Sequence, residues 1–367
     1  MVRLICFFLI LITCNSLVQA QEKPEITFGG FVDTYYSYNF NHPKETAAAD
    51  VSTVSGVALP SATNTYRYYD SYHNQMTVNL VEFNMLVKFK EVSLYTDFDF
   101  GPFADMNATV SSTAGSSSDE VSKHIGQAVF SYRPVSSRFF FEAGKMYTHV
   151  GLETVKSKDN FNYSRTVLFS YGMPFWHTGA RFGYDAIPEK LQTSFYVYNG
   201  WNSIYDTNES KTVGAQLKYT PTSNFNLIYN FIGGAERVRS EGNWKTVHEL
   251  NTTYSVSSDL TFVADVLFGS EDKAKWYGGL LTAKYVLSDA SYISPRFEIY
   301  TDKDGFTLGS GEQTIQTYTL SYGRRLTQGL DYRAEVRVDT SDEKNFKTED
   351  GNEDSQTTGL MALLFNF

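Results

Sequence analysis

The sequence predicts an all-β protein, a transmembrane antiparallel up-and-down β-barrel of about 16 strands with long outer loops and an inward-folded third loop. Three observations predict it. Apolar and polar residues alternate in segments of roughly ten residues, the connections between segments alternate in length, and aromatic residues make up 16% of a chain whose mean hydropathy is only −0.31. A barrel strand turns one face to lipid and the other to water, so a polar average is compatible with a membrane wall.

The N-terminus predicts a secretory signal over residues 1–20. Arg3 supplies a positive start, residues 4–13 form an apolar run, and Val18-Gln19-Ala20 is a small-residue cleavage site. The run is too short to cross a bilayer as a helix. We therefore expect residues 1–20 to be a signal peptide and residues 21–367 to be a barrel in the bacterial outer membrane.

Both cysteines, Cys6 and Cys14, lie inside this signal. A lipoprotein anchored at Cys14 is the alternative, although Thr13 is not the small residue that normally precedes a lipid-bearing cysteine and Ala20 offers a better cut. The mature chain then has no disulfide and no cysteine cluster for zinc or haem, so we expect no metal and no cofactor. The formal net charge of −10 argues against a nucleic-acid partner.

The mature chain divides into sixteen alternating segments. In the segment 75–89 the apolar phase slips near Leu80, which predicts a β-bulge there. The segments are 28–40, 74–89, 92–100, 123–134, 138–147, 175–185, 190–200, 211–220, 224–233, 246–256, 260–270, 276–287, 290–301, 313–323, 330–340 and 356–367.

The segment 330–340 fixes which face is wet. Five charged residues share one face of it, and on that face a charge in lipid would cost about 2–4 kcal/mol at mid-depth, so they face a lumen. Val336 then faces lipid, and we expect Val336→Arg to harm insertion and Arg337→Val to be tolerated. The alternative role of these charges is cross-strand bracing of the wall. The predicted pore wall comprises His177, Arg181, Asp331, Arg333, Glu335 and Arg337.

The connections predict the orientation of the barrel. Short ones rich in Pro, Gly, Ser and Asp, such as 135–137 and 288–289, alternate with long ones, and outer-membrane barrels keep short turns in the periplasm and long loops outside. An even strand count returns the last residue to the periplasm. The long connections are 41–73, 101–122, 148–174, 201–210, 234–245, 271–275, 302–312 and 341–355, of which the first two are rich in Ala, Ser and Thr.

The third long connection is the predicted pore constriction. It mixes charges with the apolar patch 167–169, which a loop in solvent would have little reason to carry. Packed against the inner wall the patch would be buried, and Arg165 could pair with a wall acid. The alternative is an external cap, or a partly helical loop over the mouth. The predicted constriction residues are Glu153, Lys156, Asp159 and Arg165.

The final segment ends on an aromatic residue of an alternating strand, with Phe365 and Phe367 on the same face. This arrangement resembles the signal that the outer-membrane assembly machinery reads, and we expect that machinery to be a partner.

Two patches resemble the OmpL-like β-barrel porin family. One is Asn162-Tyr163-Ser164-Arg165 followed by Phe169, Pro174 and His177-Thr178-Gly179-x-Arg181, and the other is the opening strand at residues 29–38. The resemblance implies a porin and a homotrimer, and it implies no particular substrate.

A sixteen-stranded barrel is too wide for side chains to fill and leaves an aqueous channel. The sequence therefore predicts a porin that lets small hydrophilic solutes diffuse passively through a water-filled barrel with a charged constriction, in contact with outer-membrane lipid. The alternative is a non-conducting barrel whose surface loops bind a partner or a surface. No enzyme is predicted, because His177 and the serines occur without a Gly-x-Ser-x-Gly motif.

Overall fold

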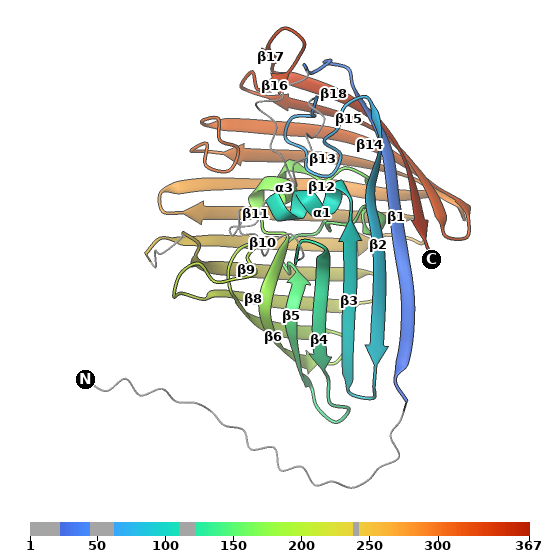
Figure 1. The fold of residues 1–367 in the computed structure, drawn as a ribbon, viewed down its shortest axis with the longest axis vertical. Coiled ribbons are helices and arrows are strands. Elements are labelled where there is room, and N and C mark those ends of the chain that lie inside the picture. The colour runs from blue at the N-terminus through green and yellow to red at the C-terminus, as the bar shows by residue number, and fades with distance from the viewer. Residues whose placement is uncertain (1–22, 45–61, 110–121, 238–241) are drawn as a thin grey trace.

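The computed structural model describes residues 23–44, 62–109, 122–237 and 242–367. Within these ranges sixteen antiparallel strands close into a barrel in which each strand pairs with its neighbours in sequence (Figure 1). The first strand pairs with both the second and the last, so the sheet has no free edge. The predicted fold class is confirmed. The predicted signal at residues 1–20 lies outside the described residues.

The strands are β1 (Glu25–Asn39), β2 (Gln75–Lys88), β3 (Val92–Phe100), β4 (Ile125–Tyr132), β5 (Phe139–Tyr147), β6 (Trp176–Ile187), β7 (Leu191–Tyr198), β8 (Thr212–Thr222), β9 (Phe225–Ala235), β10 (Trp244–Ser255), β11 (Leu260–Glu271), β12 (Ala274–Ser288), β13 (Ser291–Asp302), β14 (Gln313–Thr327), β15 (Leu330–Ser341) and β18 (Ser355–Asn366). A separate hairpin, β16 (Phe346–Lys347) with β17 (Asn352–Glu353), lies between β15 and β18. Every predicted strand is present, with ends displaced by a few residues.

The two faces of the wall differ as the alternation predicted. In β15, Val336 is 55% exposed on the outer face, whereas its neighbour Arg337 is 1% exposed on the inner face. The bulge is also where the sequence placed it, because Asp33 pairs with Leu80 and Thr34 with Val78, leaving an extra residue in β2. The alternation therefore determines which side chains face inward in each strand, and in β2 the bulge shifts that alternation by one residue.

The sixth outer connection is shorter than predicted. β11 runs to Glu271 and β12 begins at Ala274, so the predicted long loop at 271–275 is wrong and the connection is a two-residue turn. Asp272 adopts a φ of 56° there, and a short polar side chain tolerates this left-handed conformation in tight hairpin turns. The strands extend almost to the turn, through residues whose sequence is equally compatible with a loop.

Helices occur only in the connections of the described chain. They are α1 (Pro102–Thr109), the 3₁₀ turn η2 (Ser157–Asp159) and α3 (Val167–Gly172), and none of them is long and apolar enough to cross a membrane. Figure 1 shows α1 and α3 between the walls of the barrel rather than outside them. The Ala/Ser/Thr-rich parts of the first two long connections lie largely outside the described residues.

Candidate functional site

The third outer connection, residues 148–175, is called loop three below and joins β5 to β6. Its base is fixed by His177, which is fully buried. The Nδ1 of His177 lies 3.0 Å from the Gly200 carbonyl oxygen and its Nε2 lies 3.1 Å from Thr148 Oγ1. A carbonyl only accepts, so the neutral ring donates through Nδ1 and accepts the Thr148 hydroxyl at Nε2. His177 therefore holds the base of the loop and does not meet solvent.

On one side, loop three is anchored by a single lysine. The Lys156 ammonium lies 2.6 Å from Glu82 Oε2, 2.6 Å from Asp97 Oδ2 and 3.7 Å from Asp99 Oδ1, and all four side chains are at most 5% exposed. These acids are on the inner faces of β2 and β3. One loop cation thus balances part of the charge of three wall carboxylates, and loop three reaches the wall well inside the barrel.

On the other side, wall carboxylates accept hydrogen bonds from the loop backbone. Glu335 of β15 accepts the amides of Tyr163 at 2.8 Å and Ser164 at 3.2 Å. Glu298 of β13 accepts the Leu168 amide at 2.5 Å and the neighbouring Val167 amide at 3.1 Å. An irregular segment buried in a lumen has amides without secondary-structure partners, and these carboxylates satisfy them.

Wall arginines meet the loop carbonyls in the same way. Arg333 donates from Nη1 to the carbonyl oxygens of Asn160 and Phe161, both at 3.0 Å, and Arg337 donates to the Arg165 carbonyl at 2.6 Å. Arg296 of β13 ties this wall to Glu153 Oε1 at 2.6 Å. The charged side chains of β15 therefore act largely as hydrogen-bond partners for the backbone of loop three. This role differs from both predicted roles, which were to line the pore and to brace neighbouring strands.

Arg165 does not form the predicted pair with a wall acid. It is 2% exposed, and it donates to the carbonyl oxygens of Tyr163, at 2.7 Å, and Val155 of its own loop. Its guanidinium carbon also lies 4.5 Å from the centre of the Tyr69 ring. Arg165 is thus an internal brace of loop three, because carbonyls within reach along the loop compete successfully with carboxylates across the lumen.

The apolar patch of loop three is buried. Val167, Leu168 and Phe169 form the start of α3, whose first turn is capped by the Thr166 hydroxyl accepting the Phe169 amide at 3.1 Å. Leu168 fits against Gly278 of β12, where a Cβ atom would lie 2.8 Å from Leu168 Cδ1. A glycine in the wall therefore makes room for the helix.

The described end of the first outer connection also packs into the lumen, which the sequence did not indicate. Arg67 pairs with Asp339 of β15 at 2.9 Å and with Asp70, and the Tyr69 ring stacks on Phe103 of α1 at 4.9 Å between centres. The run Tyr-Arg-Tyr-Tyr-Asp at 66–70 was the available signal, since it is unusually aromatic for a solvent loop.

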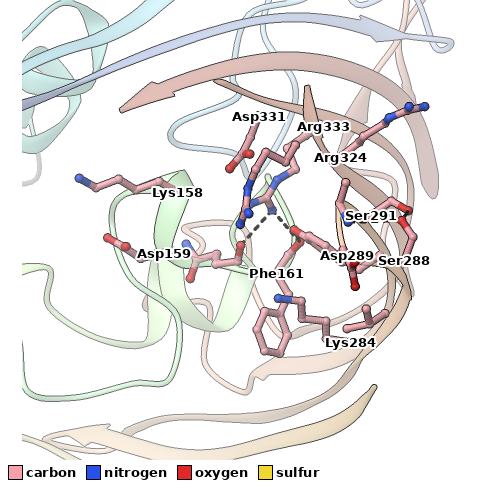
Figure 2. A pocket seen from close by; sticks show the side chains of 15 residues that line it. Lys158, Asp159, Phe161, Lys284, Ser288, Asp289, Ser291, Arg324, Asp331 and Arg333 are labelled. Atoms are coloured by element: carbon pink, nitrogen blue, oxygen red, sulfur yellow. Dashed lines mark hydrogen bonds between the residues drawn. The ribbon is translucent and has the colours of Figure 1, made fainter. Parts of the chain in front are cut away.

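Two cavities remain beside loop three. One, of about 320 Å³, opens near the short turn between β12 and β13 and is called the vestibule below; Lys284, Tyr292, Arg325, Asp331 and Arg333 are among its lining residues (Figure 2). The other, of about 300 Å³, is called the inner cavity, lies between loop three and the wall at β3 to β5, and is lined by residues that include Tyr95, Gln127, Tyr147, Glu153 and Lys156. Lys158 and Asp159 line both cavities. Asp159 is solvent-exposed there, but the surrounding protein desolvates its carboxyl and raises its pKa above the ordinary value.

The predicted site residues thus fall into two groups. Glu153, Lys156, Asp331 and Arg333 each line one of the cavities, and Asp159 lines both. The rest do not line either cavity: Arg165, His177, Glu335 and Arg337 are buried, and Arg181 is partly buried in a pair with Glu142 at 3.2 Å. Arg325 of β14 was missed, because the predicted strand stopped at residue 323 although its alternation runs on to Thr327.

The C-terminal aromatic residues are on the outer face. Phe365 is 42% exposed and Phe367 is 62% exposed, with ring centres 5.6 Å apart. The Phe367 carbonyl accepts the Gly30 amide at 3.0 Å, so the chain ends on the first strand.

This closed barrel with an occupied lumen corresponds to a known family. A family model described as "Putative beta-barrel porin-2, OmpL-like" matches residues 25–367. The chain belongs to this porin family. The family and the fold place it in the bacterial outer membrane.

Solved structures share the fold of this porin at low sequence identity. The anion-selective porin of Comamonas acidovorans matches with a TM-score of 0.61 at 9% identity, over 94% of this chain and 100% of that one. The outer membrane channel DcaP of Acinetobacter baumannii gives 0.57 at 12% identity, over 95% and 99%. OmpT of Vibrio cholerae, in its trimer form, gives 0.56 at 8% identity, over 94% and 100%. No curated protein matches the sequence.

Proposed function

We propose that this porin lets small hydrophilic solutes cross the outer membrane by passive diffusion along loop three, through the inner cavity and the vestibule. One observation carries the proposal: two cavities inside a closed barrel share Lys158 and Asp159, in the part of loop three that lies in the lumen. A solute that moves between them passes this pair of opposite charges. Lys158 and Asp159 are thus the proposed constriction charges, in place of Arg165.

Point substitutions test this better than removal of the loop. Excising residues 158–165 would also remove the buried hydrogen bonds of Tyr163 and Ser164 to Glu335. Asp159 is exposed and makes no ion pair within the described residues, so Asp159→Lys changes the charge of the path without breaking a contact.

The experiment is single-channel recording of refolded protein in planar bilayers, with reversal potentials in a salt gradient. We expect the wild-type protein to conduct. In Asp159→Lys the ion selectivity should shift toward anions, because a fixed negative charge becomes positive at a narrow point. Glu349→Lys makes the same change of charge at an exposed outer position and is the matched control. Equal reversal potentials in the two variants would show that Asp159 does not lie on the path of the ions.

A second function is favoured by one specific observation. The described parts of the first three outer loops pack on one another in the lumen, with Tyr69, Phe103, Phe169 and Phe175 among the residues of one apolar cluster. A barrel filled in this way suits a non-conducting role in which surface loops bind a partner. Refolded wild-type protein that never conducts would favour it.

We further propose that the barrel assembles as a homotrimer. OmpT of Vibrio cholerae, which shares the fold, is described in a trimer form, and the family resemblance implies the same. Cross-linking of the refolded protein at low concentration, followed by denaturing electrophoresis, should give a limiting species of three chains.

A further inference from the structure

The vestibule is the part of the open lumen with an excess of basic side chains. Five basic and three acidic residues line it, in a chain whose formal net charge is −10. Figure 2 shows Arg324 pointing away from the cavity, which leaves Lys158, Lys284, Arg325 and Arg333 as its cations. The vestibule therefore has the opposite sign to the protein as a whole.

Three of these cations have no carboxylate partner. Among the described residues, Lys284, Arg325 and Arg333 make no ion pair within 4.0 Å, although Asp331 lies directly opposite Arg325 in the pairing of β14 with β15. Cations that lie close together without an ion-pair partner repel one another, and an added anion relieves that repulsion.

Tyr292 brings two of the cations together. The Lys284 ammonium lies 4.6 Å from the centre of its ring and the Arg333 guanidinium carbon lies 5.2 Å from the same centre. The Tyr292 hydroxyl donates to the Phe161 carbonyl at 2.9 Å, which fixes the ring, and Lys284 also lies 5.3 Å from the Phe161 ring (Figure 2). Two positive groups thus flank one immobilised aromatic ring.

Arg333 carries an unsatisfied donor. It is 5% exposed, both of its hydrogen bonds come from Nη1, and its Nε has no partner. Nη2 also makes no hydrogen bond among the described residues and, unlike Nε, is not fully covered, so it can donate to a ligand that accepts hydrogen bonds. The forked guanidinium and the nearby ammonium suit a carboxylate or a phosphate.

We infer that the vestibule binds small oxyanionic solutes, carboxylate or phosphate, through Lys284, Arg325 and Arg333. The inference rests on the proposed porin function, of which it names the solute class. The volume of about 320 Å³ is sufficient for a small organic anion. Such a site on the periplasmic side of Lys158 and Asp159 would gather anions in the proposed path, in the way that basic surfaces concentrate anionic solutes.

The test compares two probes, inorganic phosphate and benzoate, on refolded protein. Each is measured by inhibition of the chloride current in bilayers and, independently of conduction, by equilibrium dialysis in detergent. The variant Lys284→Gln with Arg325→Gln removes two cations but leaves Arg333 and its bonds to loop three intact. Lys218→Gln is the control, because Lys218 is an inward-facing lysine near the periplasmic end of β8 that lines a different cavity.

We expect half-saturation by at least one probe at about tenfold higher concentration in the double variant, and little change in Lys218→Gln. Preference for phosphate would indicate an inorganic or phosphorylated solute, and preference for benzoate a carboxylate whose ring lies on Phe161 or Tyr292. Wild-type current that neither probe inhibits, with no binding in dialysis, would overturn the inference and leave the porin proposal standing. Protein that binds a probe but never conducts would instead overturn the porin proposal.

Discussion

Replacing Lys156 by methionine is expected to release one end of loop three. The two contacts of 2.6 Å join side chains that are at most 5% exposed, so the variant leaves Glu82, Asp97 and Asp99 buried together without their cation. Removing one partner from a buried ion pair costs about 3–5 kcal/mol. We expect a loss of this size in the free energy of unfolding, moderated because the carboxylates can take up protons.

The assay is urea unfolding of refolded protein in lipid vesicles, followed by tryptophan fluorescence. Lys303→Met is the matched control, because it breaks an ion pair of similar length, 3.1 Å to Glu312, between side chains that are 54% and 62% exposed. Exposed pairs contribute about 1 kcal/mol or less. Equal losses in the two variants would refute a stabilising role for the Lys156 cluster.

The same cluster predicts a dependence on pH. Burial by itself would lower the pKa of Lys156, but the carboxylates of Asp99, Asp97 and Glu82 outweigh it and raise the pKa above the ordinary value of 10.5. The folded-state pKa thus exceeds the unfolded one, so the stabilisation is fully present below pH 10.5 and is lost as the pH rises through the folded pKa. Between wild type and Lys156→Met, the difference in unfolding free energy should therefore shrink in alkaline buffer, where Lys156 loses its proton, and also in acid, where the carboxylates that attract Lys156 become protonated.

Four further predictions concern the wall, the path and the C-terminus. Val336→Arg should lower the free energy of insertion by about 2–4 kcal/mol, against about 0–1 kcal/mol for Val135→Arg in a periplasmic turn, as measured by folding titrations into vesicles. The sequence alone implied that Arg337→Val would be tolerated, but the structure predicts a loss. The variant removes the hydrogen bond to the Arg165 carbonyl and should cost about 1–3 kcal/mol in the same titration. Because desolvation by the surrounding protein raises the pKa of Asp159, its negative charge is lost at a higher pH than that of an ordinary aspartate, so on acidification the reversal potentials should begin to move toward anions at a higher pH in wild type than in Asp159→Asn. Deleting Phe367 should slow assembly into cell outer membranes while leaving refolding into detergent nearly unchanged, and equal defects in both settings would argue against a signal role.

The sequence by itself determined the wall of the barrel. Alternation with a period of two is a local property, and the cost of a charge in lipid decides which of the two faces is wet, so Val336 and Arg337 could be assigned without coordinates. The slip of phase at Leu80 was visible for the same reason. The sequence did not fix the ends of the strands as well, because the residues around the two-residue turn at Asp272 are of the same types as those in the longer loops.

Only the tertiary structure decided what the inward charges do. Closure of the barrel brings Glu82, Glu298 and Glu335, from strands far apart in sequence, around one loop, and no pattern along the chain encodes which of them that loop will meet. A buried loop must find partners for its own amides and carbonyls, and the nearest wall charges supply them. That requirement turned Arg337 into a support for loop three, kept Arg165 within its own loop, and left Lys284 and Arg333 facing the open vestibule without a carboxylate.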